Sequence, residues 1–316
     1  MKVTLIKSGI LSSVYKDFES SMSVCLRQLG IDDETIQNWS DTGEEGPYLT
    51  DEKKFLGYTL RNLCIAEKTT RNDKLFIADP VLYQVYRKAI KRLQDPSYEN
   101  IKNKMLESLE VEYSGRFRAV NILHLMKLQT GGKKFDRLII RKLGNDRDEE
   151  FDPLRIALHT PPEFMRPMSE IKSDHPDNPM IVSSLIHKAG GQCVNWGSFN
   201  RWLGGYLTIQ LKNDNSSSFN KTTKDYALKI IAPVVQDAHE SNAEVIATLD
   251  PRGLEAIDTY QETIMKDLGI EKKPLPVMYA TDLINISLGM SANRIDSSSR
   301  KTNYESVFKK LGLSTS

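Results

Sequence analysis

Apolar residues recur along the chain at two spacings, one typical of strands and one typical of helices, and the two kinds of segment alternate. The run at residues 2–8, KVTLIKS, predicts a strand. Gly30 ends the helix expected next, whose apolar residues lie at helical spacing: Val14, Phe18, Met22, Cys25, Leu26 and Leu29. A second helix at residues 51–68, a strand at 73–79 and a third helix at 79–93 follow. The first half therefore predicts strands that alternate with helices.

The same order of elements returns after a charged connector at residues 141–153, RKLGNDRDEEFDP. Residues 153–160, PLRIALHT, predict a strand, and residues 178–190 predict a helix that stops at Gly190. The segment AEVIATLDP, at residues 243–251, parallels DKLFIADP of the first half. We interpret this repetition as a diverged internal duplication of about 150 residues.

The predicted fold is α/β, with two tandem similar α/β domains whose sheets are parallel or mixed and are flanked by helices. The expected domains are residues 1–150 and residues 151–290. Residues 291–316 form a polar tail with apolar positions at Tyr304, Val307, Phe308, Leu311 and Leu313. Two interpretations of the tail stay open: a frayed end with one marginal helix, or an amphipathic helix that docks on a partner.

Composition narrows the class of protein. Lys and Arg number 43 against 42 Asp and Glu, so the chain lacks the basic surplus of a non-specific nucleic-acid binder. Its three cysteines, Cys25, Cys64 and Cys193, are too far apart for a zinc motif or a secreted disulfide framework. Cys25 is expected in the core. The apolar runs are too short to span a bilayer, and the first residues enter a strand without a leader pattern. We expect a cytoplasmic protein that associates with a membrane, if at all, through partners.

Candidate chemistry lies where predicted strands end. Asp79-Pro80 and Asp250-Pro251 each separate a strand from a helix, where Asp can cap the helix and Pro can occupy its first position. Such a cap contributes about 1 kcal/mol and requires no function. A catalytic carboxylate or a metal ligand is the alternative interpretation of both aspartates. His159 ends a strand and is either a structural histidine or an acid, base or ligand.

Taken together, these turns resemble the tandem cysteine-rich (CCG) domains of the heterodisulfide reductase B-type family. The resemblance covers residues 1–290 and follows the order of several segments: LIKSGILSSVYKDFESSMSVCLRQLGI, NWSDTGEE, IALHTPPEFMRP, AGGQCVNW, RWLGG, AEVIATLDPRGLEAID and LPVMYATDLINISLGM. In that family each domain carries a single Cys, a Cys-Cys-Gly and a Cys-x-x-Cys, and these thiolates hold iron-sulfur clusters. The resemblance thus implies a tandem α/β fold and a place in an electron-transfer system.

The cluster ligands of the family have no cysteine counterpart in this chain. The matching positions are Ile10, Asp41, Thr42, Asp79 and Leu82 in the first half, and Pro162, Trp202, Leu203, Asp250 and Gly253 in the second. Because these clusters depend on thiolate ligands, the resemblance implies that this chain holds neither a cofactor nor a metal. Iron-sulfur clusters and flavin are expected in partner subunits instead.

Three functional hypotheses follow. The first is a cluster-free, pseudo-catalytic member of the heterodisulfide reductase B-type family that serves as a structural or docking subunit of a heterodisulfide reductase-like or succinate dehydrogenase-like complex. Its implied partners are an iron-sulfur subunit of the heterodisulfide reductase C or succinate dehydrogenase B type and possibly a flavoprotein. The second is an enzyme that reuses the inter-domain cleft, with Asp41, Asp79, Asp250 and His159 in acid-base chemistry. The third is an atypical cluster held by oxygen ligands or Cys193.

Overall fold

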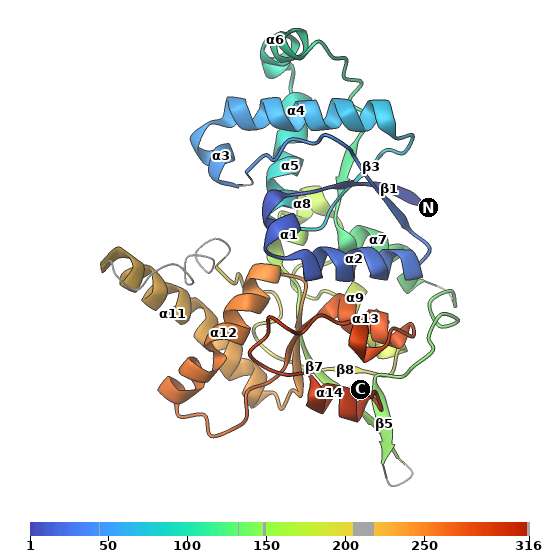
Figure 1. Ribbon diagram of the computed structural model, residues 1–316, viewed down its shortest axis with the longest axis vertical. Helices are drawn as coiled ribbons and strands as arrows, with labels where there is room; N and C mark the ends of the chain where they lie inside the picture. Colours follow the sequence, from blue (N-terminus) through green and yellow to red (C-terminus); the bar gives the residue numbers. More distant parts are fainter. Residues whose placement is uncertain (44, 132, 148–149, 205–217, 315–316) are drawn as a thin grey trace. The chain divides into compact units, whose positions relative to one another are not determined.

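The structure is a computed structural model that describes residues 1–43, 45–131, 133–147, 150–204 and 218–314. The chain divides into two compact units, Met1–Leu125 and Met126–Ser316 (Figure 1). Each is a sheet flanked by helices, so the predicted α/β class with two tandem similar units is confirmed.

The first unit is built on a four-stranded parallel sheet in the order β2-β1-β3-β4. Its strands are β1 (Lys2–Ile6), β2 (Asp32–Thr35), β3 (Lys74–Ile77) and β4 (Arg118–Val120). Its helices are α1 (Gly9–Ser13), α2 (Lys16–Gln28), α3 (Glu45–Thr50), α4 (Glu52–Thr69), α5 (Pro80–Leu93), η1 (Pro96–Tyr98), α6 (Glu99–Leu109) and the start of α7 (Ile122–Thr130). Figure 1 shows the strands between α2 on one side and α4 on the other.

The core of this unit follows the predicted helical faces. Phe18, Met22 and Cys25 of α2 are fully buried, and so are Phe55 and Leu60 of α4. Gly30 ends the segment after α2 with a positive φ of 74°, a conformation that glycine adopts at little cost.

The second unit repeats this topology. Its parallel sheet has the order β10-β9-β7-β8, so in both units the first strand lies between the second and the third. The strands are β7 (Arg155–His159), β8 (Gln192–Cys193), β9 (Val245–Thr248) and β10 (Val277–Tyr279). The helices are η2 (Pro162–Phe164), α8 (Met168–Ile171), α9 (Ile181–Lys188), α11 (Ser218–Glu240), α12 (Pro251–Leu268), α13 (Ala280–Ser287), η4 (Ala292–Arg294) and α14 (Glu305–Lys310). Helices α11 and α12 cover one face of the sheet, and α9 and α13 cover the other (Figure 1).

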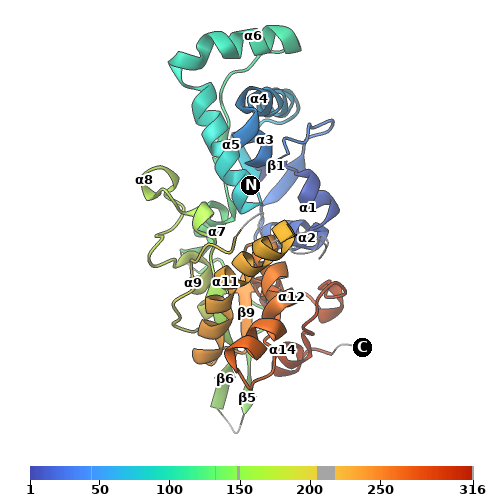
Figure 2. The ribbon, with the colours of Figure 1, turned by 90° about the vertical axis from the view of Figure 1, so that its left-hand side faces the viewer.

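The charged segment that the sequence marks as a connector is an antiparallel hairpin of the second unit. It comprises β5 (Gly144–Arg147) and β6 (Glu150–Pro153), and Figure 2 shows it projecting from this unit. Leu143 and Leu154, which flank the hairpin, are fully buried and joined by a backbone hydrogen bond. The hairpin is therefore anchored in the core of the second unit.

Two further expectations differ from the structure. Val14 belongs to the apolar positions of the expected helix but is 54% exposed, because it follows the short helix α1 and precedes the start of α2 at Lys16. The expected separate tail is instead packed on the second unit: Tyr304, Val307, Phe308 and Leu311 are all at most 5% exposed. The apolar face that suggests a docking helix is thus covered by this chain itself.

The C-terminal segment is held by polar contacts as well. The Tyr304 hydroxyl donates to the Val277 carbonyl at 2.9 Å, and the Lys310 ammonium contacts Glu244 at 2.8 Å and Asp152 at 3.0 Å. These bonds tie α14 to β10 and to the hairpin. None of the helices in the described part of the chain is both long and apolar enough to span a membrane.

Candidate functional site

The strand order of each unit places the topological switch point between its first and third strands, where ligands of open α/β sheets commonly bind. In the first unit this point lies between the ends of β1 and β3. Ser8 follows β1 and caps α1 by accepting from the Leu11 amide at 3.1 Å. Asp79 follows β3 and caps α5 by accepting from the Leu82 amide at 2.7 Å. Asp79 is fully buried, so its carboxylate serves the helix start as the sequence predicts.

Asp41 and Thr42 lie beside the turn that follows β1. A Cβ on Gly9 would overlap Asp41 Oδ2, so the carboxylate lies directly over that turn. Thr42 is 4% exposed and shares a hydrogen bond with the hydroxyl of Tyr86, which lies on α5 together with Leu82. The structure therefore brings the turn at Ile10, the segment 41–42 and α5 together within the first unit.

Asn62 of α4 holds the segment before Asp41 in place. Its amide nitrogen donates to the Ser40 carbonyl at 2.8 Å and to the Tyr86 hydroxyl at 2.9 Å, and its carbonyl accepts from the Ser40 amide at 2.7 Å. Asn62 is fully buried, and every one of these groups is satisfied by protein. Hydrogen bonds thus hold the loop before Asp41 against α4 and α5.

His159 is the last residue of β7, the first strand of the sheet in the second unit. Its Nε2 donates to the Arg201 carbonyl at 2.7 Å, and its Nδ1 accepts from the Thr248 hydroxyl at 2.8 Å. The same hydroxyl accepts from the Asp250 amide at 3.1 Å. One neutral tautomer of the imidazole satisfies all of these groups, because a carbonyl can only accept and the hydroxyl has one proton to donate. The chain of hydrogen bonds joins the ends of β7 and β9 to the loop at Arg201.

Electrostatics agrees with a neutral His159. The side chain has no exposed surface, and burial lowers its pKa from 6.5 to about 4. Both ring nitrogens are engaged with protein groups. In this conformation His159 is therefore a structural histidine that cannot reach a substrate, although the sequence makes it a candidate acid or base.

Asp250, Leu203 and Gly253 meet at the start of α12. Asp250 caps the helix by accepting from the Arg252 amide at 3.0 Å and is 9% exposed. A Cβ on Gly253 would overlap Leu203 Cδ1 and lie 2.9 Å from Asp250 Oδ2. Leu203 is 1% exposed, so its side chain fills the space over the helix start. Three of the positions that the sequence resemblance assigns to cluster ligands are thus packed against one another.

The remaining positions of the second unit are Pro162 and Trp202. Pro162 begins η2, and Trp202 has 47% of its surface exposed. Together with Leu203, Asp250 and Gly253 they offer no sulfur atom and one carboxylate. Such a donor set does not fit an iron-sulfur cluster.

The cysteines lie elsewhere. Cys25 and Cys64 are in the core of the first unit, and burial raises the pKa of the Cys64 thiol to about 11. Cys193 on β8 is half-buried, and burial raises the pKa of its thiol to about 12. Within the described ranges no three His, Cys, Asp or Glu side chains are grouped so that they could hold a metal ion.

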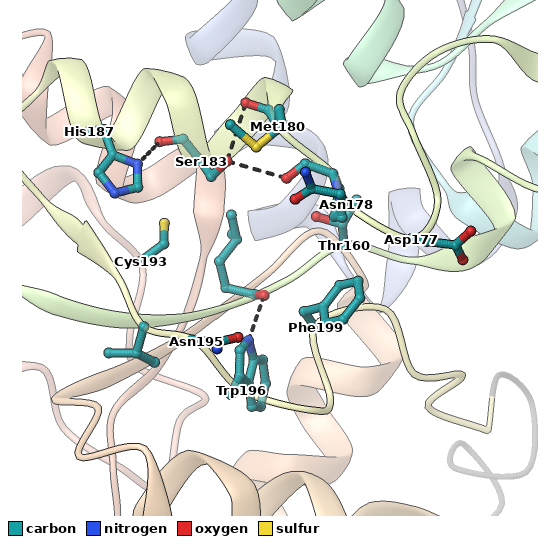
Figure 3. A pocket seen from close by; sticks show the side chains of 13 residues that line it. Thr160, Asp177, Asn178, Met180, Ser183, His187, Cys193, Asn195, Trp196 and Phe199 are labelled. Carbon is teal, nitrogen blue, oxygen red and sulfur yellow. Dashed lines mark hydrogen bonds between the residues drawn. The ribbon is translucent and has the colours of Figure 1, made fainter.

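Cavities accompany both sheet edges. In the first unit Asp41 and Thr42 line an open cavity of about 320 Å³ near the start of α4. In the second unit a cavity of about 280 Å³ lies at the ends of β7 and β8 (Figure 3). Of its walls the sequence singled out Cys193, as a possible cluster ligand, but not Trp196 or Met180, because these form no motif. Thr160 offered the one usable signal, since it directly follows a strand end.

Comparisons with known proteins place these features in context. No family model matches the chain. The 8-methylmenaquinol:fumarate reductase membrane anchor subunit of Wolinella succinogenes is 20% identical over 286 residues, which cover 90% of this chain and 92% of that protein. The crystal structure of a hypothetical protein from Helicobacter pylori matches 97% of this chain with a TM-score of 0.60 and 11% identity. The chain spans about half the length of that solved structure, with 50% of it covered. This structural likeness supports the fold.

Proposed function

We propose that this chain is a cluster-free relative of the tandem cysteine-rich subunits and acts as a non-catalytic docking subunit of an electron-transfer complex. The proposed complex is of the heterodisulfide reductase or succinate dehydrogenase type. Its iron-sulfur clusters and flavin would belong to partner subunits, among them an iron-sulfur subunit of the heterodisulfide reductase C or succinate dehydrogenase B type.

The observation that carries this proposal is the likeness over nearly the full length of both chains to a membrane anchor subunit of a fumarate reductase. A match over 90% of one chain and 92% of the other involves both units and their order, whereas a shared motif would involve only one segment. A role in the assembly of such a complex therefore suits the chain as a whole.

The geometry of the strand ends supports the cluster-free part of the proposal. In the second unit Leu203 fills the space over Gly253, and His159 joins the strand ends through hydrogen bonds. In the first unit Asp79 caps α5, and Asn62 holds the loop before Asp41. The hydrogen bonds satisfy backbone groups at Leu82, Ser40 and Arg201, and Leu203 fills space by an apolar contact.

No observation favours the hypothesis of acid-base catalysis over the docking role. Asp79 is fully buried in a cap, Asp250 is a cap at 9% exposure, and His159 is sealed from solvent. Asp41 is the exposed member of the set, and its Oδ1 accepts from the Gly43 amide at 3.1 Å. A lone exposed carboxylate in a turn has an ordinary structural explanation.

Affinity purification under anaerobic conditions tests the proposal. The tagged full-length chain would be recovered from its native organism, the co-purifying proteins identified and counted by mass spectrometry, and iron and acid-labile sulfide measured. We expect iron-sulfur and flavin subunits in a fixed ratio to the chain, and we expect the chain separated from them to contain no iron.

Two results would refute it. Assembly of the same oxidoreductase complex in a strain that lacks this chain would exclude a docking role. Stoichiometric iron in the separated chain would exclude the cluster-free assignment, and a chain in which Cys193 is replaced by serine is the control that tests that thiol as a ligand.

A further inference from the structure

The cavity of the second unit lies beside β7 on the side of β8, whereas His159 bonds to Thr248 of β9 on the other side of β7. Leu158 and Thr160 at the end of β7, Cys193 at the end of β8, and the start of α9 form its walls. Figure 3 shows Trp196 and Phe199 on one side of it and Met180 and His187 on the other. Its volume of about 280 Å³ is close to the lower end of small-molecule pockets, roughly 300 Å³.

Thr160 places a hydroxyl group at the wall of this cavity. The residue is 1% exposed, and its amide donates to the Phe199 carbonyl at 2.7 Å. Its hydroxyl borders the cavity and forms no hydrogen bond within the described residues. Because this hydroxyl faces the cavity and bonds to no described protein group, a ligand in the cavity can bond to it in place of water.

His187 provides an acceptor at the edge of the same cavity. Its Nδ1 contacts the Ser183 carbonyl at 2.7 Å and must donate to it, because a carbonyl oxygen only accepts. With that proton on Nδ1, the ring atom left to accept a hydrogen bond is Nε2, and no contact of Nε2 is formed in the part of the chain that the structure describes. His187 is exposed, so a ligand can approach it.

The charge of the cavity favours a neutral ligand. Its one carboxylate, Asp177, is paired with the Arg166 guanidinium at 2.6 Å. The described lining includes neither Lys nor Arg. Cys193 contributes an uncharged thiol, because burial raises its pKa to about 12. A charged ligand would lose its hydration here without gaining an ion pair.

The apolar walls favour a ring. Trp196 is held by a hydrogen bond from its Nε1 to the Leu158 carbonyl at 3.0 Å and is 6% exposed, so its indole is fixed in place. Phe199 lies beside Trp196, and Met180, which is 52% exposed, contributes a thioether at the mouth of the cavity. Aromatic rings and thioethers both form favourable contacts with a planar aromatic ligand.

We propose that this cavity binds a small, uncharged aromatic molecule that carries a hydroxyl group, with the hydroxyl bonded to Thr160 and the ring between Trp196, Phe199 and Met180. The inference depends on the chemistry of the cavity and is independent of the proposed role in a complex. A molecule of one or two fused rings suits the volume.

Calorimetric titration of the full chain with three matched probes tests the proposal. The probes are 2-naphthol, naphthalene without the hydroxyl, and 2-naphthoate with a charge. We expect 2-naphthol to bind about tenfold more tightly than 2-naphthoate. Thr160→Val should weaken 2-naphthol about fivefold and leave naphthalene unchanged, since it removes one hydrogen bond and keeps the shape. Thr69→Val in the first unit is the control and should leave the affinities for 2-naphthol and for naphthalene unchanged.

A second pair of variants keeps the test valid if Thr160→Val does not fold. Met180→Glu places a charge at the mouth of the cavity on an exposed side chain and should weaken both neutral probes about tenfold. Met168→Glu changes another exposed methionine, which does not line the cavity, and should have no effect. Equal affinity for 2-naphthol and 2-naphthoate would overturn the proposal, and so would affinities unchanged in Met180→Glu.

Discussion

The buried imidazole of His159 should make the second unit sensitive to acid. The perturbation is His159→Gln, because a glutamine amide can donate to the Arg201 carbonyl and accept from the Thr248 hydroxyl but does not titrate near neutral pH. Wild type and variant therefore differ chiefly in one titrating group. His175→Gln, at an exposed position, is the matched control.

The sign and size follow from the lowered pKa of His159. The folded-state pKa is about 4, against 6.5 for an unperturbed histidine, so the unfolded state binds more protons between these two values. The free energy of unfolding should therefore fall as the pH falls from about 6.5 to about 4, and this group should contribute nothing to the slope above that window. The full loss is about 3 kcal/mol, and about 2 kcal/mol of it is reached at about pH 5.

Urea unfolding at a series of pH values, followed by tryptophan fluorescence, measures this effect. Trp196 and Trp202 both report on the second unit. We expect wild type to be the more stable protein at neutral pH, and its advantage over His159→Gln to shrink by about 3 kcal/mol as the pH falls to about 4. Carboxylate protonation destabilises both proteins alike and cancels in the difference. An advantage that stays constant within about 0.5 kcal/mol across this range would refute the buried neutral state of His159.

Three further predictions concern other parts of the chain. Lys310→Met should lower the free energy of unfolding by about 2 kcal/mol, because it removes the cation that bridges two partly buried carboxylates, Asp152 and Glu244. The exposed Lys309→Met should change the free energy of unfolding by less than about 0.5 kcal/mol, and urea unfolding measures both variants. Gly253→Ala should lower the free energy of unfolding by about 2 kcal/mol, because the added Cβ would overlap Leu203. The double variant with Leu203→Ala should lose less stability than the sum of the two single variants, and additive losses in a double-mutant cycle would contradict the contact. Iodoacetamide near pH 8 should alkylate Cys193 at least about 100-fold more slowly than free cysteine, because burial raises the pKa of the Cys193 thiol to about 12. Peptide mass spectrometry measures the rate, and a rate close to that of free cysteine would contradict the raised pKa.

The C-terminal segment shows what a local pattern leaves open. Tyr304, Val307, Phe308 and Leu311 form one apolar face in the sequence pattern, and α14 forms over part of it. Periodicity shows that such a face must be covered but does not identify the surface that covers it. The Tyr304 bond to Val277 and the Lys310 contact with Asp152, 158 positions away in sequence, show that the second unit covers it.

The sequence by itself determined the features that depend on neighbours along the chain. The alternation of strands and helices, the repetition of that order, and the caps at Asp79 and Asp250 all depend on groups within a few residues of one another. Side-chain spacing and the orphan amides of a helix start act over that range, so they can be recognised in one dimension. The lack of thiols at the ten positions that the sequence resemblance assigns to cluster ligands is likewise a property of the sequence.

Only the tertiary structure decided which candidate residues meet and what state they adopt. His159 is 89 positions from Thr248 and 42 from Arg201, and its neutral form depends on both contacts and on complete burial. The cavity at Thr160 exists because β7, β8 and α9 leave space between them, although each element by itself forms an ordinary buried surface. The protonation state of a buried group depends on its desolvation and its hydrogen bonds, and both are set by how separate elements pack. A pattern along the chain can therefore locate residues such as His159 and Thr160, but it cannot assign their chemistry.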